Sequence, residues 1–185
     1  MKIALVLSGS SAIGKGLGTE IDSHDLVIRM MDCEWQDNHP KDYGSKYDYG
    51  ILPGPWSVEN TTKRIVKQPT QGWLLYYLEY QKRKRVFPSK IYDKIVLESL
   101  SRISKSHFTE KVVPTRGLAA LELIFKFFPV TKLRVYFGDS LRTGHLTKYI
   151  NGESNINPKN IMRHSYILEK KVIEELWGDY VEHRV

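Results

Sequence analysis

The sequence has little of what marks several protein classes. Cys33 is the single cysteine among 185 residues, so the chain cannot form an internal disulfide. We therefore expect the protein to reside in a reducing compartment. No apolar run approaches the about 18 residues that a spanning helix needs. The longest near-apolar stretch, Ile124 to Val130, contains Lys126, and the opening apolar run stops at Ser8, too early for a signal peptide. These absences predict a soluble protein of the cytoplasm.

Motifs for metal and covalent chemistry are missing as well. The chain has neither an HExxH pattern nor a set of cysteines and histidines spaced for zinc. It also has no GxSxG turn, no Walker A ending and no Cys–His pair for covalent catalysis. We therefore predict no metal site.

The charge is one-sided, with 28 Lys plus Arg against 21 Asp plus Glu and a formal net charge of +7. Such an excess favours anionic ligands: nucleotides, nucleic acid or acidic headgroups. A tight basic cluster at residues 81–85 (QKRKR) follows the aromatic residues Trp73, Tyr76, Tyr77 and Tyr80. That mixture supports an alternative in which the protein binds nucleic acid or glycosylates it, or a peripheral contact with an anionic membrane. A solvated face explains a charge run equally well.

The order of elements predicts one α/β domain over residues 1–185. A buried strand over residues 2–7, a glycine-rich turn and a second strand over 25–31 outline a nucleotide-binding unit. Hydrophobic spacing predicts helices over 74–85, 91–104, 118–128 and 165–176, and a strand over 133–137. Residues 32–60 are expected to be mainly loop with short strands, and residues 140–160 to be a long polar loop.

Two turns and two histidines are the candidates for chemistry. Small residues after the first strand place backbone N–H groups where a phosphate could sit, although a tight connection explains them too. Thr115 is either the N-cap of the next helix or part of an anion site at its start. His145 and His164 lie near the carboxyl end, and Glu169 follows His164 by five residues.

Four segments, in order, resemble the sialylmotifs of the glycosyltransferase family 29 sialyltransferases. Residues 16–30 (GLGTEIDSHDLVIRM) are similar to the long motif, and residues 41–46 (KDYGSK) to a segment that follows it. Residues 114–123 (PTRGLAALEL), continuing to VYFG at 135–138, resemble the short motif. His164 with Glu169 matches the very short motif, and His145 lies where the family carries a further histidine.

This resemblance implies a GT-A-like variant of a single Rossmann-like domain, with a mostly parallel sheet flanked by helices. It implies an inverting, metal-independent glycosyltransferase that uses a CMP-sugar as donor substrate and no cofactor. His164 would be the general base and His145 would support the donor phosphate. The residues implied in donor-nucleotide binding are Ser8, Gly9, Ser10, Arg29, Thr115, Arg116 and Gly117.

The sequence departs from the family pattern at three of these places. Gly9 and Met31 stand where the family has asparagine, and Arg116 replaces a small hydroxyl residue. The donor sugar therefore stays open between sialic acid, Kdo and another CMP-sugar. The expected partners are this donor and a glycan or glycolipid acceptor, with a peripheral location at the inner face of the membrane as one possibility.

Overall fold

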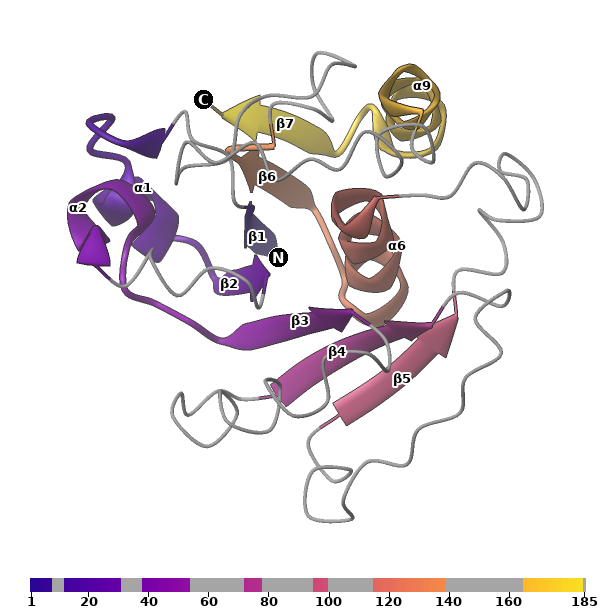
Figure 1. The fold of residues 1–185 in the computed structure, drawn as a ribbon, viewed down its shortest axis with the longest axis horizontal. Coiled ribbons are helices and arrows are strands. Elements are labelled where there is room, and N and C mark those ends of the chain that lie inside the picture. Colours follow the sequence, from indigo (N-terminus) through magenta and orange to yellow (C-terminus); the bar gives the residue numbers. More distant parts are fainter. Residues whose placement is uncertain are drawn as a thin grey trace, which may run out of the picture.

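A central sheet organises the computed structural model, which describes residues 1–7, 12–30, 38–53, 72–77, 95–99, 115–138 and 165–184. The sheet has seven strands in the order β5-β4-β3-β2-β1-β6-β7, and each neighbouring pair is parallel (Figure 1). For residues 52–53, 72–77, 95–99 and 116 only the backbone is described. The strands are β1 (Lys2–Val6), β2 (Leu26–Met30), β3 (Tyr49–Pro53), β4 (Gly72–Tyr77), β5 (Ile95–Ser99), β6 (Lys132–Tyr136) and β7 (Val181–Arg184).

Helices cover both faces of this sheet. The short helices α1 (Gly18–Asp22) and α2 (Pro40–Tyr43) lie on one face, and α6 (Arg116–Phe127) and α9 (Tyr166–Trp177) lie on the other (Figure 1). The prediction of an α/β fold with a parallel sheet between helices is confirmed.

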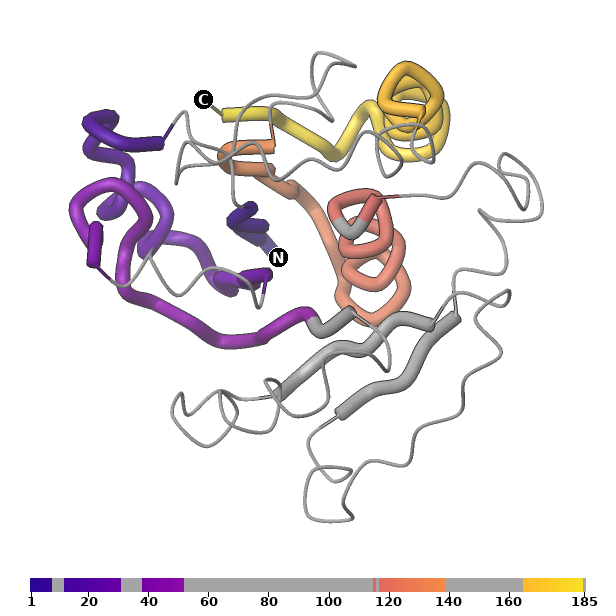
Figure 2. The backbone as a smooth tube through the Cα atoms, viewed as in Figure 1, coloured from indigo at the N-terminus to yellow at the C-terminus, as the bar shows by residue number. Residues whose placement is uncertain are grey.

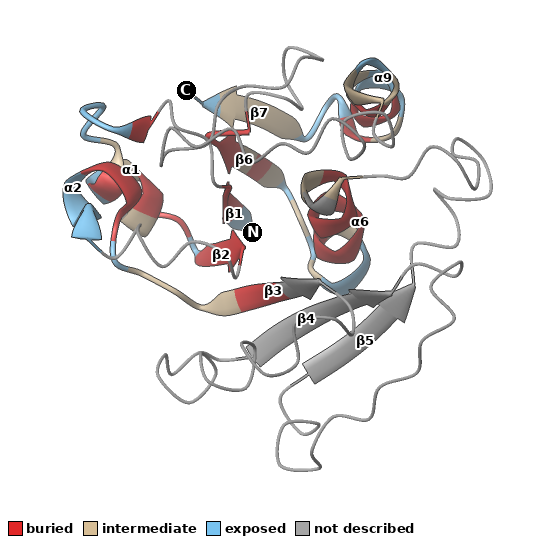
Figure 3. Cartoon of the chain, in the orientation of Figure 1, coloured by how far each residue is buried: buried red, intermediate tan, exposed pale blue. Residues whose placement is uncertain are grey.

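The continuous apolar runs of β1 and β2 follow from this arrangement. Ile3 and Leu5 pack into the cluster below α6, whereas Ala4 and Val6 pack toward α1, and all four are fully buried. A strand covered on both faces needs apolar side chains at successive positions, so alternation with polar residues is lost. Figure 3 shows this burial along the central strands.

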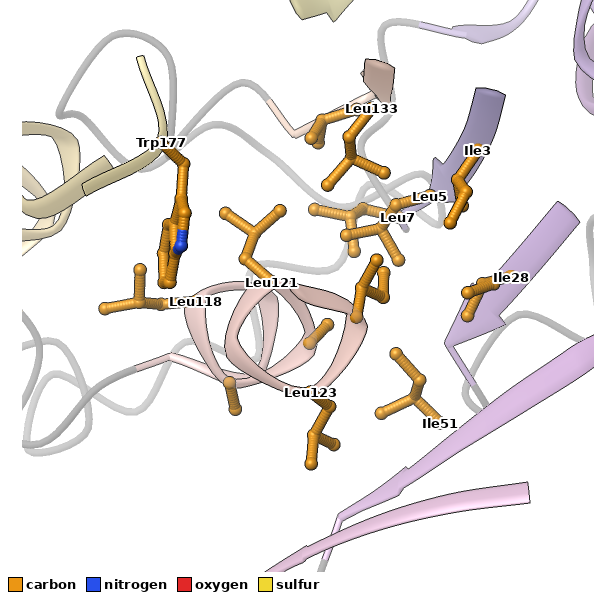
Figure 4. Packing of buried hydrophobic residues seen from close by; sticks show 14 of the residues in the cluster. Ile3, Leu5, Leu7, Ile28, Ile51, Leu118, Leu121, Leu123, Leu133 and Trp177 are labelled. Atoms are coloured by element: carbon orange, nitrogen blue, oxygen red, sulfur yellow. The ribbon is translucent and has the colours of Figure 1, made fainter. Parts of the chain in front are cut away.

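Helix α6 is the centre of the larger core. Its residues 118–124 are all buried, since the sheet lies on one side and α9 on the other. Leu118, Leu121 and Leu123 project among Ile28, Ile51 and Trp177 in Figure 4. The rings of Phe125 and Trp177 stack with their centroids 5.2 Å apart, which joins the carboxyl-terminal halves of α6 and α9. Among the residues of α6 whose burial is described, only Lys126 and Phe127, in the last turn, are exposed.

A polar network fastens the other face. Glu20 of α1 accepts hydrogen bonds from the Tyr136 hydroxyl (2.8 Å) and from Arg134 Nη1 (3.2 Å). Arg184 Nε of β7 lies 3.5 Å from the same carboxylate oxygen. One carboxylate thus ties α1 to the two strands at this end of the sheet.

Two sequence predictions are wrong. Helices were expected over 74–85 and 91–104, but the residues of these ranges that the structure describes belong to the strands β4 and β5. Both strands are short apolar runs rich in aromatic or β-branched residues, and a period of 3.6 cannot be told from a buried strand over so few positions. Strand β7 was not predicted, because it is short and carries three polar or charged residues.

The other elements are confirmed to within a few residues. The strands expected over 2–7, 25–31 and 133–137 are β1, β2 and β6, and the helices expected over 118–128 and 165–176 are α6 and α9. None of the helices in the described ranges is long and apolar enough to cross a membrane.

Candidate functional site

The strand order changes direction beside β1, which locates the candidate site. From β1 the chain builds outward through β2, β3 and β4 to β5, and then returns to place β6 on the opposite side of β1. Figure 2 shows the early and late parts of the chain side by side at this point. In open parallel sheets, ligands bind outside the carboxyl ends of the strands where the order reverses. Ser8 to Ser10 directly follow β1 in the sequence, and Gly138 follows β6.

Both large helices begin at this edge of the sheet. Phe128, the C-cap of α6, packs its ring 5.1 Å from that of Tyr49, the first residue of β3. The carboxyl end of α6 therefore lies at the amino edge of the sheet and its start at the carboxyl edge. Helix α9 runs beside α6 in the same direction, because Phe125 meets Trp177 near the two ends and Thr115 meets Glu169 near the two starts.

Thr115 is the N-cap of α6, and its polar atoms are all engaged. Its Oγ1 accepts a hydrogen bond from the Leu118 amide at 3.3 Å, which confirms the N-cap prediction. Its backbone N–H donates to Glu169 Oε1 at 2.7 Å, and its hydroxyl donates to Glu169 Oε2 at 2.6 Å. Both donors of Thr115 are thus bound by one carboxyl group.

Glu169 is fully buried one turn into α9. Burial raises the pKa of this carboxyl to about 7, although the two hydrogen bonds from Thr115 act to lower it. Helix α9 starts at the N-cap Ser165, whose Oγ accepts from the Leu168 amide at 3.4 Å. His164 immediately precedes this N-cap in the sequence.

The long-motif segment and the KDYGSK segment bind each other on the α1 face. Asp22 accepts hydrogen bonds from the amides of Ser45 and Lys46, at 2.9 Å each. A Cβ on Gly18 would lie 2.1 Å from the Pro40 carbonyl oxygen, so only glycine fits where these segments cross. These two segments therefore fit each other closely on this face of the sheet.

Asp42 of α2 binds the glycine-rich loop that follows β1. Its Oδ1 accepts from the Gly16 amide at 2.8 Å. Hydrogen bonds from the amides of Gly16 and Gly14, the first being the stronger, hold the pKa of Asp42 below its usual value. From the sequence, this loop was expected to be part of a nucleotide-binding unit. In the structure its amides bind an internal carboxylate.

Arg29 lies on the α1 face of β2 and is buried. Its Nε donates to the Lys46 carbonyl at 2.9 Å, and its Nη2 donates to the Tyr43 carbonyl at 2.7 Å. These contacts support the α2 segment. A role of Arg29 in donor binding stays a prediction.

The remaining predicted site residues divide into two groups. Thr115, Gly117 and the backbone of Arg116 lie together at the start of α6. Ser8, Gly9, Ser10, His145 and His164 lie outside the described residues.

Sequence reasoning did not foresee that Glu169 binds Thr115 or that Asp42 binds the glycine loop. The spacing of His164 and Glu169 was a signal for the first contact, but it does not name a partner 54 residues away. Nothing in the sequence signalled the second contact.

Comparison with known proteins places this geometry among solved folds. A crystal structure of a mammalian sialyltransferase superimposes with a TM-score of 0.60 at 13% sequence identity, covering 99% of this chain and 68% of that one. The chain has a sialyltransferase-like fold. A second structure, a mammalian sialyltransferase in complex with Gal-beta-1-3GalNAc-ortho-nitrophenol, gives a TM-score of 0.55 at the same identity and the same coverage.

Similarity of sequence gives no further evidence for the family. No protein-family model matches the chain, and no curated protein matches it significantly. The resemblance to sialyltransferases is therefore confirmed by the fold, which extends over nearly the whole chain.

Proposed function

We propose that the chain is an inverting, metal-independent glycosyltransferase that moves a sugar from a CMP-sugar to a hydroxyl of a glycan acceptor. The observation that carries the proposal is the likeness to a mammalian sialyltransferase fold over 99% of the chain. The ordered motif matches add support, because two of them meet in space where Thr115 binds Glu169. We assign the domain to a sialyltransferase-like α/β fold with a parallel sheet flanked by helices.

The start of α6 suits the phosphate of the donor. The first amides of a helix have no partner within it and carry its positive end, so they attract anions. With Thr115 bound to Glu169, the amides of Arg116 and Gly117 are the groups that we assign to the phosphate. Ser8, Gly9 and Ser10 follow β1 in the sequence, and we assign them to the donor nucleotide.

His164 is the proposed general base. Neutral imidazole would take the proton of the acceptor hydroxyl as its oxygen attacks the anomeric carbon from the side opposite CMP. The bond between that carbon and the phosphate oxygen breaks, CMP leaves with the electron pair, and the configuration inverts. An unperturbed histidine pKa of about 6.5 permits this step at neutral pH. His145 would stabilise the charge on the departing phosphate.

The proposed reaction type leaves open which CMP-sugar is the donor and which molecule is the acceptor. Sialic acid, Kdo or another CMP-sugar is consistent with Gly9, Met31 and Arg116 at their positions. A glycan acceptor is favoured because one similar sialyltransferase structure holds Gal-beta-1-3GalNAc-ortho-nitrophenol. The nucleic-acid alternative depends on the basic cluster at 81–85, which lies outside the described residues.

The test is binding of CMP followed by a screen of CMP-sugars for donor hydrolysis and transfer. CMP at millimolar concentration should raise the melting temperature, and His164→Ala should abolish transfer while CMP binding is retained. His39→Ala changes an exposed histidine at the start of α2 and is the matched control. Absence of any CMP-induced shift in the wild type would overturn the proposal.

A further inference from the structure

The contact between Glu169 and Thr115 joins the starts of the two large helices. It comprises two hydrogen bonds of 2.7 and 2.6 Å to one fully buried carboxyl group. It lies at the carboxyl edge of the sheet, next to the reversal of strand order.

This contact limits what Thr115 can do. A hydroxyl has one proton and a backbone amide has one, and Glu169 accepts both. The Thr115 oxygen also accepts from the Leu118 amide. A donor phosphate could use Thr115 only by displacing a buried carboxyl group, which would then lose both of its partners.

We propose that Glu169 is a positioning residue that acts through Thr115, fixing the first turn of α6 so that the amides of Arg116 and Gly117 bind the donor phosphate. The inference rests on the proposed function for the identity of the ligand. Thr115 is accordingly a link between the two helices and does not itself contact the donor.

The conservative variant distinguishes positioning from a direct or charge-based role. In Glu169→Gln the amide oxygen accepts from the Thr115 N–H and the NH₂ group faces the Thr115 oxygen, so the link persists without charge. Its CMP dissociation constant should stay within about threefold of wild type, whereas Glu169→Ala should raise it about tenfold or more. Glu174→Ala, on an exposed position of the same helix, should leave it unchanged.

A double-mutant cycle decides whether Thr115 touches the donor. Thr115→Val removes the hydroxyl and keeps the size of the side chain, and Thr115→Ser keeps the hydroxyl. If Thr115 acts only with Glu169, adding Thr115→Val to Glu169→Ala should weaken CMP binding by less than about twofold further. A full additional loss in the double variant, with amide exchange at Leu118 no faster than in Glu169→Ala, would identify Thr115 as a direct ligand and overturn the proposal.

Amide hydrogen exchange keeps this inference separate from the proposed function. If the wild type does not bind CMP, the proposed function fails, and the positioning of α6 is still decided by exchange at Thr115 and Leu118. Faster exchange at both amides in Glu169→Ala, restored in Glu169→Gln, would support the link. Unchanged exchange in Glu169→Ala would overturn it.

Discussion

Glu169 Oε2 accepts a hydrogen bond from the Thr115 hydroxyl at 2.6 Å, across 54 positions of the chain. The carboxyl group has no exposed surface. Ionising it inside the protein is costly, and two hydrogen bonds only partly offset that cost. The stability of the fold should therefore depend on pH through this group.

The first prediction concerns that pH dependence. Burial raises the pKa of Glu169 from 4.5 to about 7, so between these values the native state binds more protons than the unfolded state. The free energy of unfolding should fall as pH rises through this window, by up to about 3 kcal/mol from this group. Glu169→Gln stays neutral, and its stability relative to wild type should rise over the same window. Urea unfolding of both proteins from pH 4 to pH 8 measures this, and a constant difference would contradict it.

The second prediction concerns Gly18. A Cβ there would lie 2.1 Å from the Pro40 oxygen and 2.8 Å from the Gly44 nitrogen, both backbone atoms. Gly18→Ala should cost about 2–3 kcal/mol, because α1 and the α2 segment must move apart. At Gly14 a Cβ would meet nothing within 4 Å, but φ is +79°. Gly14→Ala should therefore cost about 1 kcal/mol from backbone strain alone. Thermal or urea unfolding gives the ranking, which an equal loss in the two variants would refute.

The third prediction tests the network around Tyr136. Tyr136→Phe removes the hydroxyl that donates to Glu20 and should cost about 1 kcal/mol. Glu20→Ala should cost about 2 kcal/mol, since it leaves the buried hydroxyl without this acceptor and removes one of the two carboxylates that Arg134 binds, the other being Glu182. The double variant should lose less than the sum. Tyr180→Phe changes a largely exposed tyrosine and should lie within about 0.5 kcal/mol of wild type. Additive losses would show that Glu20 and Tyr136 are not coupled.

The fourth prediction concerns Asp42 and the glycine loop. Asp42→Ala should speed hydrogen exchange of the Gly16 amide about tenfold, because a charge-assisted hydrogen bond is lost. The pKa of Asp42 is lowered below 3.8, so in the wild type the protection is present above that pH. It is lost as pH falls through the lower pKa of the folded state. Asp179→Ala, at an exposed position, is the control. Equal exchange of Gly16 in Asp42→Ala and wild type would exclude this role.

How much of the fold was predictable depended on the length of each pattern. The twelve-residue helix α6 has apolar positions over more than three turns, a Thr115 cap and a following Pro129, and its place was clear from the sequence. Strands β1 and β6 were also clear, because β1 is a short apolar run, β6 alternates basic and apolar residues, and a glycine-containing turn follows each in the sequence. The runs that became β4 and β5 are too short for hydrophobic spacing to separate helix from strand, and pairing of β4 with β3 and of β5 with β4 made them strands.

The candidate site was predictable only in part, because sequence order does not say which polar groups meet. Asp22, Gly18 and Gly44 belong to the segments that resemble the family motifs, and tertiary contacts show that they fit one segment to another. Arg29 was predicted to bind the donor, and in the structure its guanidinium binds two backbone carbonyls of the neighbouring segment.

The sequence by itself determined the α/β class, the two large helices and the likeness to sialyltransferase motifs, because these depend on local spacing. Only the tertiary structure decided that β6 lies beside β1, that α6 and α9 start together, and that Glu169 reaches Thr115. The physical reason is the burial of a carboxyl group. An acidic residue on an amphipathic helix is ordinarily exposed to solvent. Glu169 is buried because two helices packed against one sheet enclose it.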